Sequence, residues 1–87
     1  MTIHQYRIYQ HPAGFDAEVR VVTPAGVELR TSRIGEAYKN LSGAKAACRR
    51  YYASLFLPGP GRLPSLPWKQ LGSEDDAWWQ AVVEVTS

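Results

Sequence analysis

Few residues in this chain carry side chains that could take part in catalysis or bind a metal ion, and the main candidates are the histidines and one run of acids. His4 and His11 are the two histidines, and neither has a cysteine or carboxylate at ligand spacing. A metal site needs three or four converging ligands, so we expect no bound metal. The acidic run Glu74-Asp75-Asp76 lacks the spaced oxygens and the glycine of a calcium loop and is interpreted as a solvated turn. Because no nucleophile, base and orienting group come together, we predict that the chain is not an enzyme and uses no cofactor.

Cys48, the single cysteine, falls on the apolar stripe of a helix expected from residue 42 onward. A cysteine buried in such a stripe behaves as a small hydrophobe, whereas a nucleophilic thiol needs exposure and a lowered pKa. We therefore interpret Cys48 as a core residue. One cysteine cannot form an internal disulfide, and this favours a reducing, cytoplasmic environment.

Three arginines on expected strands form a candidate surface for anions or nucleic acid. In the hairpin register given below, Arg20 lies directly opposite Arg30, and Arg7 on the first strand joins them on the outer face of the sheet. Like charges so placed repel each other, which leaves two interpretations. Either Glu18 and Glu28 neutralise the pair as diagonal neighbours, or the arginines contact a negatively charged partner.

The three tryptophans, Trp68, Trp78 and Trp79, all lie within twenty residues of the C-terminal end of the sequence. A core this small cannot easily bury three such large side chains, so they are candidates for a protein interface. If their segment is a strand, the adjacent Trp78 and Trp79 point to opposite faces. Residues 77–85 then form part of a homodimer interface, by strand pairing or by crossing onto a second copy. The alternative is that Trp78 or Trp79 closes the bottom of the chain's own core.

The elements that position these residues begin with an antiparallel meander of strands in residues 2–9, 15–23 and 27–33. Apolar and polar residues alternate in the first two, which is the period of a half-buried strand. The sequence Thr-Pro-Ala-Gly at 23–26 is typical of a tight turn, because proline presets φ and glycine accepts a positive φ. Pairing residue 23 with residue 27 sets the buried neighbours, which are Val21 beside Leu29 and Val19 beside Thr31.

A helix follows, with Ser42 as its predicted N-cap and Pro58 as the residue that ends it. Its apolar residues recur at helical spacing: Ala44, Ala47, Cys48, Tyr51 and Leu55. Residues 58–72 hold four of the six prolines and three of the seven glycines and are predicted to be a loop. We expect this loop to pack over the domain's own core rather than to present its P-x-x-P motif, residues 64–67, to a partner.

The final segment, residues 73–87, carries two opposing signals. Ser73 followed by acids is typical of a helix start, whereas the aromatic and β-branched residues from Trp78 to Thr86 favour a strand. We interpret the segment as a short turn and then a strand that extends the sheet. The whole chain, 1–87, is thus predicted to be one α+β domain. Its antiparallel sheet has three or four strands with one helix across one face, and the fourth strand comes last in the sequence.

Short motifs in the first half of the chain resemble the YegP-like small domains of unknown function. They are Gly14-Phe15, Val19, Gly26, Leu29, Thr31-Ser32, Tyr38 and Ala44, and the likeness covers residues 1–50. This resemblance implies a three-stranded sheet with one helix across it and no known catalysis. The element order, with Tyr6-Arg7 and residues 15–20, is also similar to the DNA-binding domains of plant ethylene-response factors and of integrase arm-site readers. In those domains, arginines on the exposed sheet face read the major groove.

Composition and the distribution of charge limit the classes of function that we expect for this chain. No apolar run approaches the ~20 residues of a membrane span, and His4, Gln5 and Arg7 come soon after Met1, so we expect neither a membrane span nor a signal peptide. Residues 1–57 carry eight basic against four acidic residues, and residues 58–87 carry two against four, so a basic body precedes a mildly acidic tail. We predict a non-catalytic protein-interaction module that self-associates, with a protein or its own second copy as partner. The alternatives are a small nucleic-acid-binding domain that uses the arginine face, and a small phage or mobile-element inhibitor.

Overall fold

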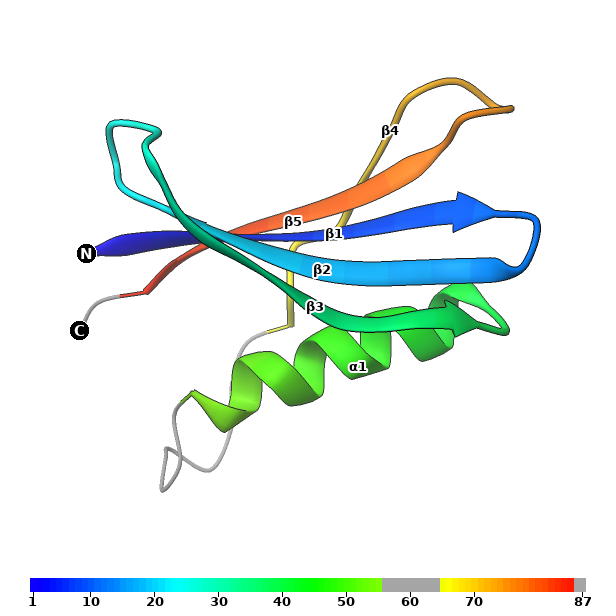
Figure 1. Ribbon diagram of the computed structural model, residues 1–87, viewed down its shortest axis with the longest axis horizontal. Coiled ribbons are helices and arrows are strands. Elements are labelled where there is room, and N and C mark those ends of the chain that lie inside the picture. Colours follow the sequence, from blue (N-terminus) through cyan, green and yellow to red (C-terminus); the bar gives the residue numbers. More distant parts are fainter. Residues whose placement is uncertain (56–64, 86–87) are drawn as a thin grey trace.

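Five β-strands and one α-helix make up the computed structural model, which describes residues 1–55 and 65–85. They are β1 (Thr2–His11), β2 (Gly14–Val22), β3 (Glu28–Tyr38), α1 (Leu41–Ser54), β4 (Lys69–Leu71) and β5 (Trp78–Val85). Neighbouring strands are antiparallel in the order β3-β2-β1-β5-β4, and α1 packs across one face (Figure 1). The predicted α+β class with one helix is confirmed, but the sheet has five strands in the described residues instead of three or four.

β1 lies at the centre of the sheet, and its alternating residues decide which face is buried. Tyr6 and Ile8 are fully buried on the side of α1. Tyr6 pairs with Val19 of β2 and with Ala81 of β5, and both of these partners are also buried. Because cross-strand partners share a face, the two ladders present one continuous apolar surface to the helix.

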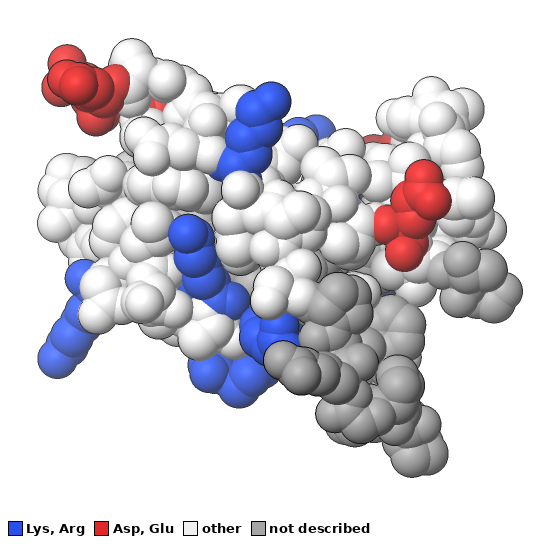
Figure 2. All heavy atoms as spheres, turned by 180° about the vertical axis from the view of Figure 1, so that it is seen from behind, with Lys and Arg blue, Asp and Glu red and all other residues white. Residues whose placement is uncertain are grey.

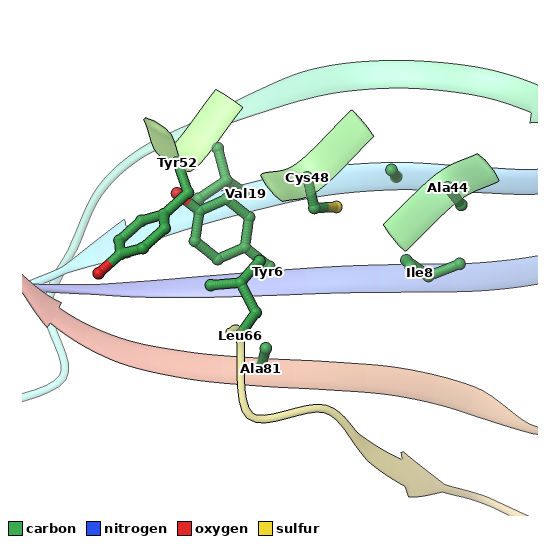
Figure 3. Close-up of a cluster of buried hydrophobic side chains, with 9 residues drawn as sticks. Tyr6, Ile8, Val19, Ala44, Cys48, Tyr52, Leu66 and Ala81 are labelled. Carbon is green, nitrogen blue, oxygen red and sulfur yellow. The ribbon is translucent and has the colours of Figure 1, made fainter. Parts of the chain in front are cut away.

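Tyr6 occupies the middle of the core that forms between the sheet and α1 (Figure 3). Its ring lies edge-on to the rings of Tyr51 and Tyr52, with centroids 6.2 and 6.1 Å away. Aromatic pairs favour this arrangement, and it ties the last turns of α1 to β1. Leu66 belongs to the same buried cluster. The predicted packing of the 58–72 loop over the core is therefore confirmed at this residue, while residue 64 of its P-x-x-P motif lies outside the described residues.

The β2–β3 hairpin has the predicted turn but not the predicted register. Thr23 N donates to Val27 O at 2.9 Å, and Gly26 N donates to Thr23 O at 2.8 Å. Leu29 is then an extra residue on β3, because Val22 pairs with Glu28 and the next residue, Val21, pairs with Arg30. The expected pairs of Val21 with Leu29, Val19 with Thr31 and Arg20 with Arg30 are therefore wrong: Val19 faces Ser32 and Arg20 faces Thr31.

The N-cap of the helix lies two residues before the predicted one. Asn40 is the N-cap, and its Oδ1 accepts a hydrogen bond from Gly43 N at 2.7 Å. Ser42 lies inside α1, which ends at Ser54, before Pro58 and before the stretch outside the described residues. Ala44, Ala47 and Cys48 of the predicted stripe are buried, whereas Leu55 is exposed and Tyr52, which the stripe did not include, is buried in its place.

The C-terminal segment is a strand, as predicted, but its place in the sheet was not foreseen. β5 lies between β1 and β4, so it is not an edge strand along Trp78–Gln80. β4 falls inside the stretch expected to be loop. Its three residues are too few to show an alternating pattern, which is why the sequence signal failed there.

Ala37, near the end of β3, has a φ of 55°, the left-handed region that favours glycine. Its backbone N–H donates to Asp16 Oδ1 at 2.9 Å, which holds this conformation in place. Replacing Ala37 with glycine removes the clash of the methyl group with the backbone, so we expect Ala37→Gly to stabilise the fold by about 1 kcal/mol in urea unfolding.

A matched control is Ala46→Gly on the exposed side of α1, where glycine should destabilise by about 1 kcal/mol. The two substitutions thus have opposite expected signs. A less stable Ala37→Gly protein would show that the left-handed backbone carries no strain.

Candidate interaction surfaces

One face of the sheet points away from α1, and we call it the open face. In β1 its residues are those that alternate with buried Tyr6 and Ile8, and their cross-strand partners lie beside them. Its central members are Gln5, Arg7, Tyr9, Glu18, Arg20, Trp78, Gln80, Val82 and Glu84. Arg7, Tyr9, Trp78 and Gln80 are half-buried by their neighbours, while Val82 is exposed.

The middle of the open face holds an arginine and two aromatic rings, which we call the Arg7–Trp78–Tyr9 stack. The Arg7 guanidinium lies 5.5 Å from the centre of the Trp78 ring, a cation–π contact. The ring of Tyr9 also stacks on the ring of Trp78, with ring centroids 5.7 Å apart and ring planes inclined by 21°. Arg7 also donates to Gln80 Oε1 and to Gln5 Oε1, each at 3.2 Å. The guanidinium is therefore held in one orientation from three sides.

The three arginines singled out in the sequence do not share a face. Arg7 and Arg20 lie on the open face, but Arg30 pairs with buried Val21 and so lies on the side of α1. The bulge at Leu29 causes this separation, because one extra residue reverses the direction of every following side chain. Arg20 Nε lies 3.1 Å from Glu28 Oε1, so an acid does sit against this arginine.

The three tryptophans also fall on separate surfaces. Trp78 is on the open face, and Trp79 is on the other, as expected for adjacent residues of a strand. Trp79 packs against Phe15 with ring centroids 5.8 Å apart and contacts the core cluster. Trp68 lies beside α1, where Lys45 Nζ is 5.9 Å from the centre of its ring. Trp79 thus covers the chain's own core, and Trp78 faces outward.

The sheet's outer strands differ in how open they are to pairing. β3 carries three register irregularities and several charged residues, features that discourage pairing with another chain. On the other side, β4 pairs only with Trp78–Gln80. Within the described residues no strand pairs with 81–85 on the side away from β1.

A hydrogen-bonded pair that sequence spacing did not suggest joins His11 and Asp16. His11 Nδ1 accepts from Ala13 N at 3.2 Å, so its Nε2 carries the proton and donates to Asp16 Oδ1 at 2.8 Å. The same oxygen accepts from Ala37 N. The two donors lower the pKa of Asp16, with His11 contributing most. The pair ties the β1–β2 turn to the end of β3. His11 and Asp16 are five residues apart in the sequence, and this spacing is the one signal that could have suggested their contact.

The other candidate groups are structural or isolated. Burial raises the pKa of the Cys48 thiol to about 12, which disfavours the reactive thiolate. His4 is buried, and burial together with the Arg30 charge lowers its pKa. Among residues 1–55 and 65–85, no three His, Cys, Asp or Glu side chains converge on a place where a metal ion could bind. No helix in this described part is long and apolar enough to cross a membrane.

Comparisons with family models, with curated proteins and with solved structures find no match for this chain. The resemblances noted in the sequence therefore remain expectations.

The Asp16 contacts predict a pH-dependent stability. Because the folded-state pKa of Asp16 lies below its unfolded value of about 3.9, its contribution is present above that value and is lost as pH falls through the folded pKa. Asp16→Asn should be less stable than wild type at neutral pH, and the difference should shrink toward pH 3 in urea unfolding. Asp75→Asn, in an exposed turn, is the control. A difference that stays constant with pH would contradict this account.

Cys48 should be inert in the folded protein. At pH 8 we expect a thiol-labelling reagent to react at least ~100-fold more slowly with the native chain than with the chain in denaturant, because the sulfur is buried and protonated. Cys48→Ala should cost about 1 kcal/mol of stability through the small cavity it leaves. Labelling of the native chain at the denatured rate would contradict the assignment.

Proposed function

We propose that this chain is a non-catalytic protein-interaction module that self-associates through its open face. The observation that carries the proposal is the Arg7–Trp78–Tyr9 stack at the centre of that face. Tryptophan, tyrosine and arginine are the residue types that dominate binding energy in protein interfaces, and such residues cluster near the interface centre. Here all three meet on a face that α1 does not cover.

The stack is ordered before any partner arrives. Gln5 and Gln80 accept hydrogen bonds from the guanidinium of Arg7, and the Trp78 ring contacts both this guanidinium and the ring of Tyr9. A side chain that is already immobilised loses little conformational entropy on binding. The stack can therefore serve as a rigid anchor.

A second copy is the partner that the charges of the open face favour. Among the residues that strand pairing places on this face, four are basic and four are acidic: Arg7, Arg20, Arg33, Lys69, Asp16, Glu18, Glu28 and Glu84. A twofold interface places a surface against itself, so a surface of one sign would repel its copy, whereas a balanced one can pair. Packing of two such sheets face to face is a common arrangement.

The area of the face predicts a dissociable dimer. Five strands about 4.8 Å apart, with about eight residues of about 3.4 Å each, span roughly 600 Å² per copy. Two copies then bury about 1,200 Å², the lower end of the range for specific interfaces. In the described part of the chain, β5 leaves only residues 81–85 without a second strand partner, which is a short stretch for strand pairing, so the side chains of the face carry the contact.

Sedimentation equilibrium over a concentration series tests this proposal. We expect a monomer–dimer equilibrium that Trp78→Ala weakens about 30-fold or more, the effect of removing an interface anchor worth about 2 kcal/mol. Arg7→Lys should also weaken it, because lysine keeps the charge but loses the planar group that covers the tryptophan.

Arg50→Ala, on the exposed side of α1, is the matched control and should leave the equilibrium unchanged. Circular dichroism checks that each variant folds. A wild-type chain that stays monomeric at high concentration, or a dimer that Trp78→Ala leaves intact, would refute self-association through this face.

A further inference from the structure

An excess of basic over acidic residues lies on the side of α1, opposite the open face. From Lys39 to residue 55 there are four basic residues, Lys39, Lys45, Arg49 and Arg50, and no acidic one, against a net charge of +2 for the whole chain. Figure 2 shows most of the Lys and Arg side chains in view over the lower half of the molecule, where Figure 1 places α1, and acidic side chains toward the two ends. Lys39, Arg49 and Arg50 are exposed.

A hollow opens on this side between α1 and the segment that leads into β4. Its volume is about 210 Å³, and Lys45, Ala46, Arg49, Ser65, Leu66 and Trp68 line it. The half-buried Trp68 ring forms part of its wall, with Lys45 Nζ 5.9 Å from the ring centre. The hollow is smaller than the roughly 300 Å³ of the smallest drug-sized pockets, so it suits a single planar ring system.

A nucleotide fits this combination of a basic rim and an aromatic wall. Bases stack on aromatic side chains, and lysine and arginine pair with the phosphates that join them. A base in a duplex is already paired and stacked, so it enters a hollow only at the free-energy cost of unpairing and unstacking, which a single strand does not have to meet in full. A membrane surface is disfavoured because the apolar residues of α1, among them Ala44 and Cys48, are buried against the sheet and cannot insert.

We propose that the outer side of α1 binds single-stranded nucleic acid, with one base in the hollow against Trp68 and the backbone along Lys39, Lys45 and Arg50. This site is separate from the open face, so binding and self-association do not compete for the same residues. The contacts are to phosphate and to the flat face of a base, which all bases share. Recognition is therefore tolerant of sequence.

Fluorescence anisotropy with the full chain tests the proposal, using labelled oligo(dT), oligo(U) and a duplex of the same length as probes. Either single strand should bind more tightly than the duplex, and the affinity should fall steeply between about 50 and 200 mM salt. Trp68→Ala should weaken binding about tenfold or more through lost stacking. Lys45→Gln should weaken it and reduce the slope of log affinity against log salt by about 0.7.

Arg33→Gln, an exposed arginine on the open face, is the matched control and should leave the affinity unchanged. The Lys45→Gln slope keeps the test decisive if Trp68→Ala fails to fold. Three results would each overturn the proposal: no binding to either single strand at low salt, tighter binding to duplex, or equal binding of single strands by wild type and Lys45→Gln. Binding to anionic vesicles or acidic peptides in place of the oligonucleotides would also overturn it.

Discussion

The pairing of β1 with a strand on each side is the interaction on which the rest of the structure depends. β2 on one side and β5 on the other complete the sheet around Tyr6 and Ile8, whose burial orients the apolar surface toward α1. The same pairing determines the other face, because every residue that alternates with Tyr6 must point away from the helix. Arg7 and Tyr9 meet Trp78 only because β5 lies beside β1. In the described residues a single helix packs on the five-stranded sheet, so α1 covers one face and not the other.

Much of the fold could be predicted from the sequence where the signals are local. The alternation in β1 and β2, the turn at 23–26, the helix and the strand character of residues 78–85 all come from patterns within a few residues of one another. The register of β3 could not be predicted, because the bulge at Leu29 depends on how the strand packs and not on its own residues. The choice of Asn40 as N-cap could not be predicted either, because Ser42, two residues later, is also a residue type that caps helices well.

The candidate surfaces could be predicted only in part, because most of their contacts join residues that are far apart in the sequence. Trp78 and Trp79 are adjacent residues of one strand, so their side chains were predicted to point to opposite faces of the sheet, and this is confirmed. The prediction that Arg7, Arg20 and Arg30 share one face was wrong for Arg30, because it required the correct register of β3. The Arg7–Trp78–Tyr9 stack and the hollow at Trp68 each join residues more than twenty positions apart, and no periodic pattern in one sequence connects such residues. These contacts depend on which strands are neighbours, and that is decided by the burial of the whole chain.

The β1–β5 ladder also has a consequence for the order in which the molecule assembles. It pairs Thr2 with Val85, so forming it closes almost the entire chain into one loop, whereas the β1–β2 and β2–β3 hairpins close loops of a few residues. Loop-closure entropy grows with length and must be overcome before distant contacts can compensate for it. We therefore expect the three-stranded meander and α1, residues 2–54, to form first and β5 to dock afterwards. In that order Trp78 reaches Arg7 only at the last step, so we expect a newly made or partly folded chain to lack the complete stack.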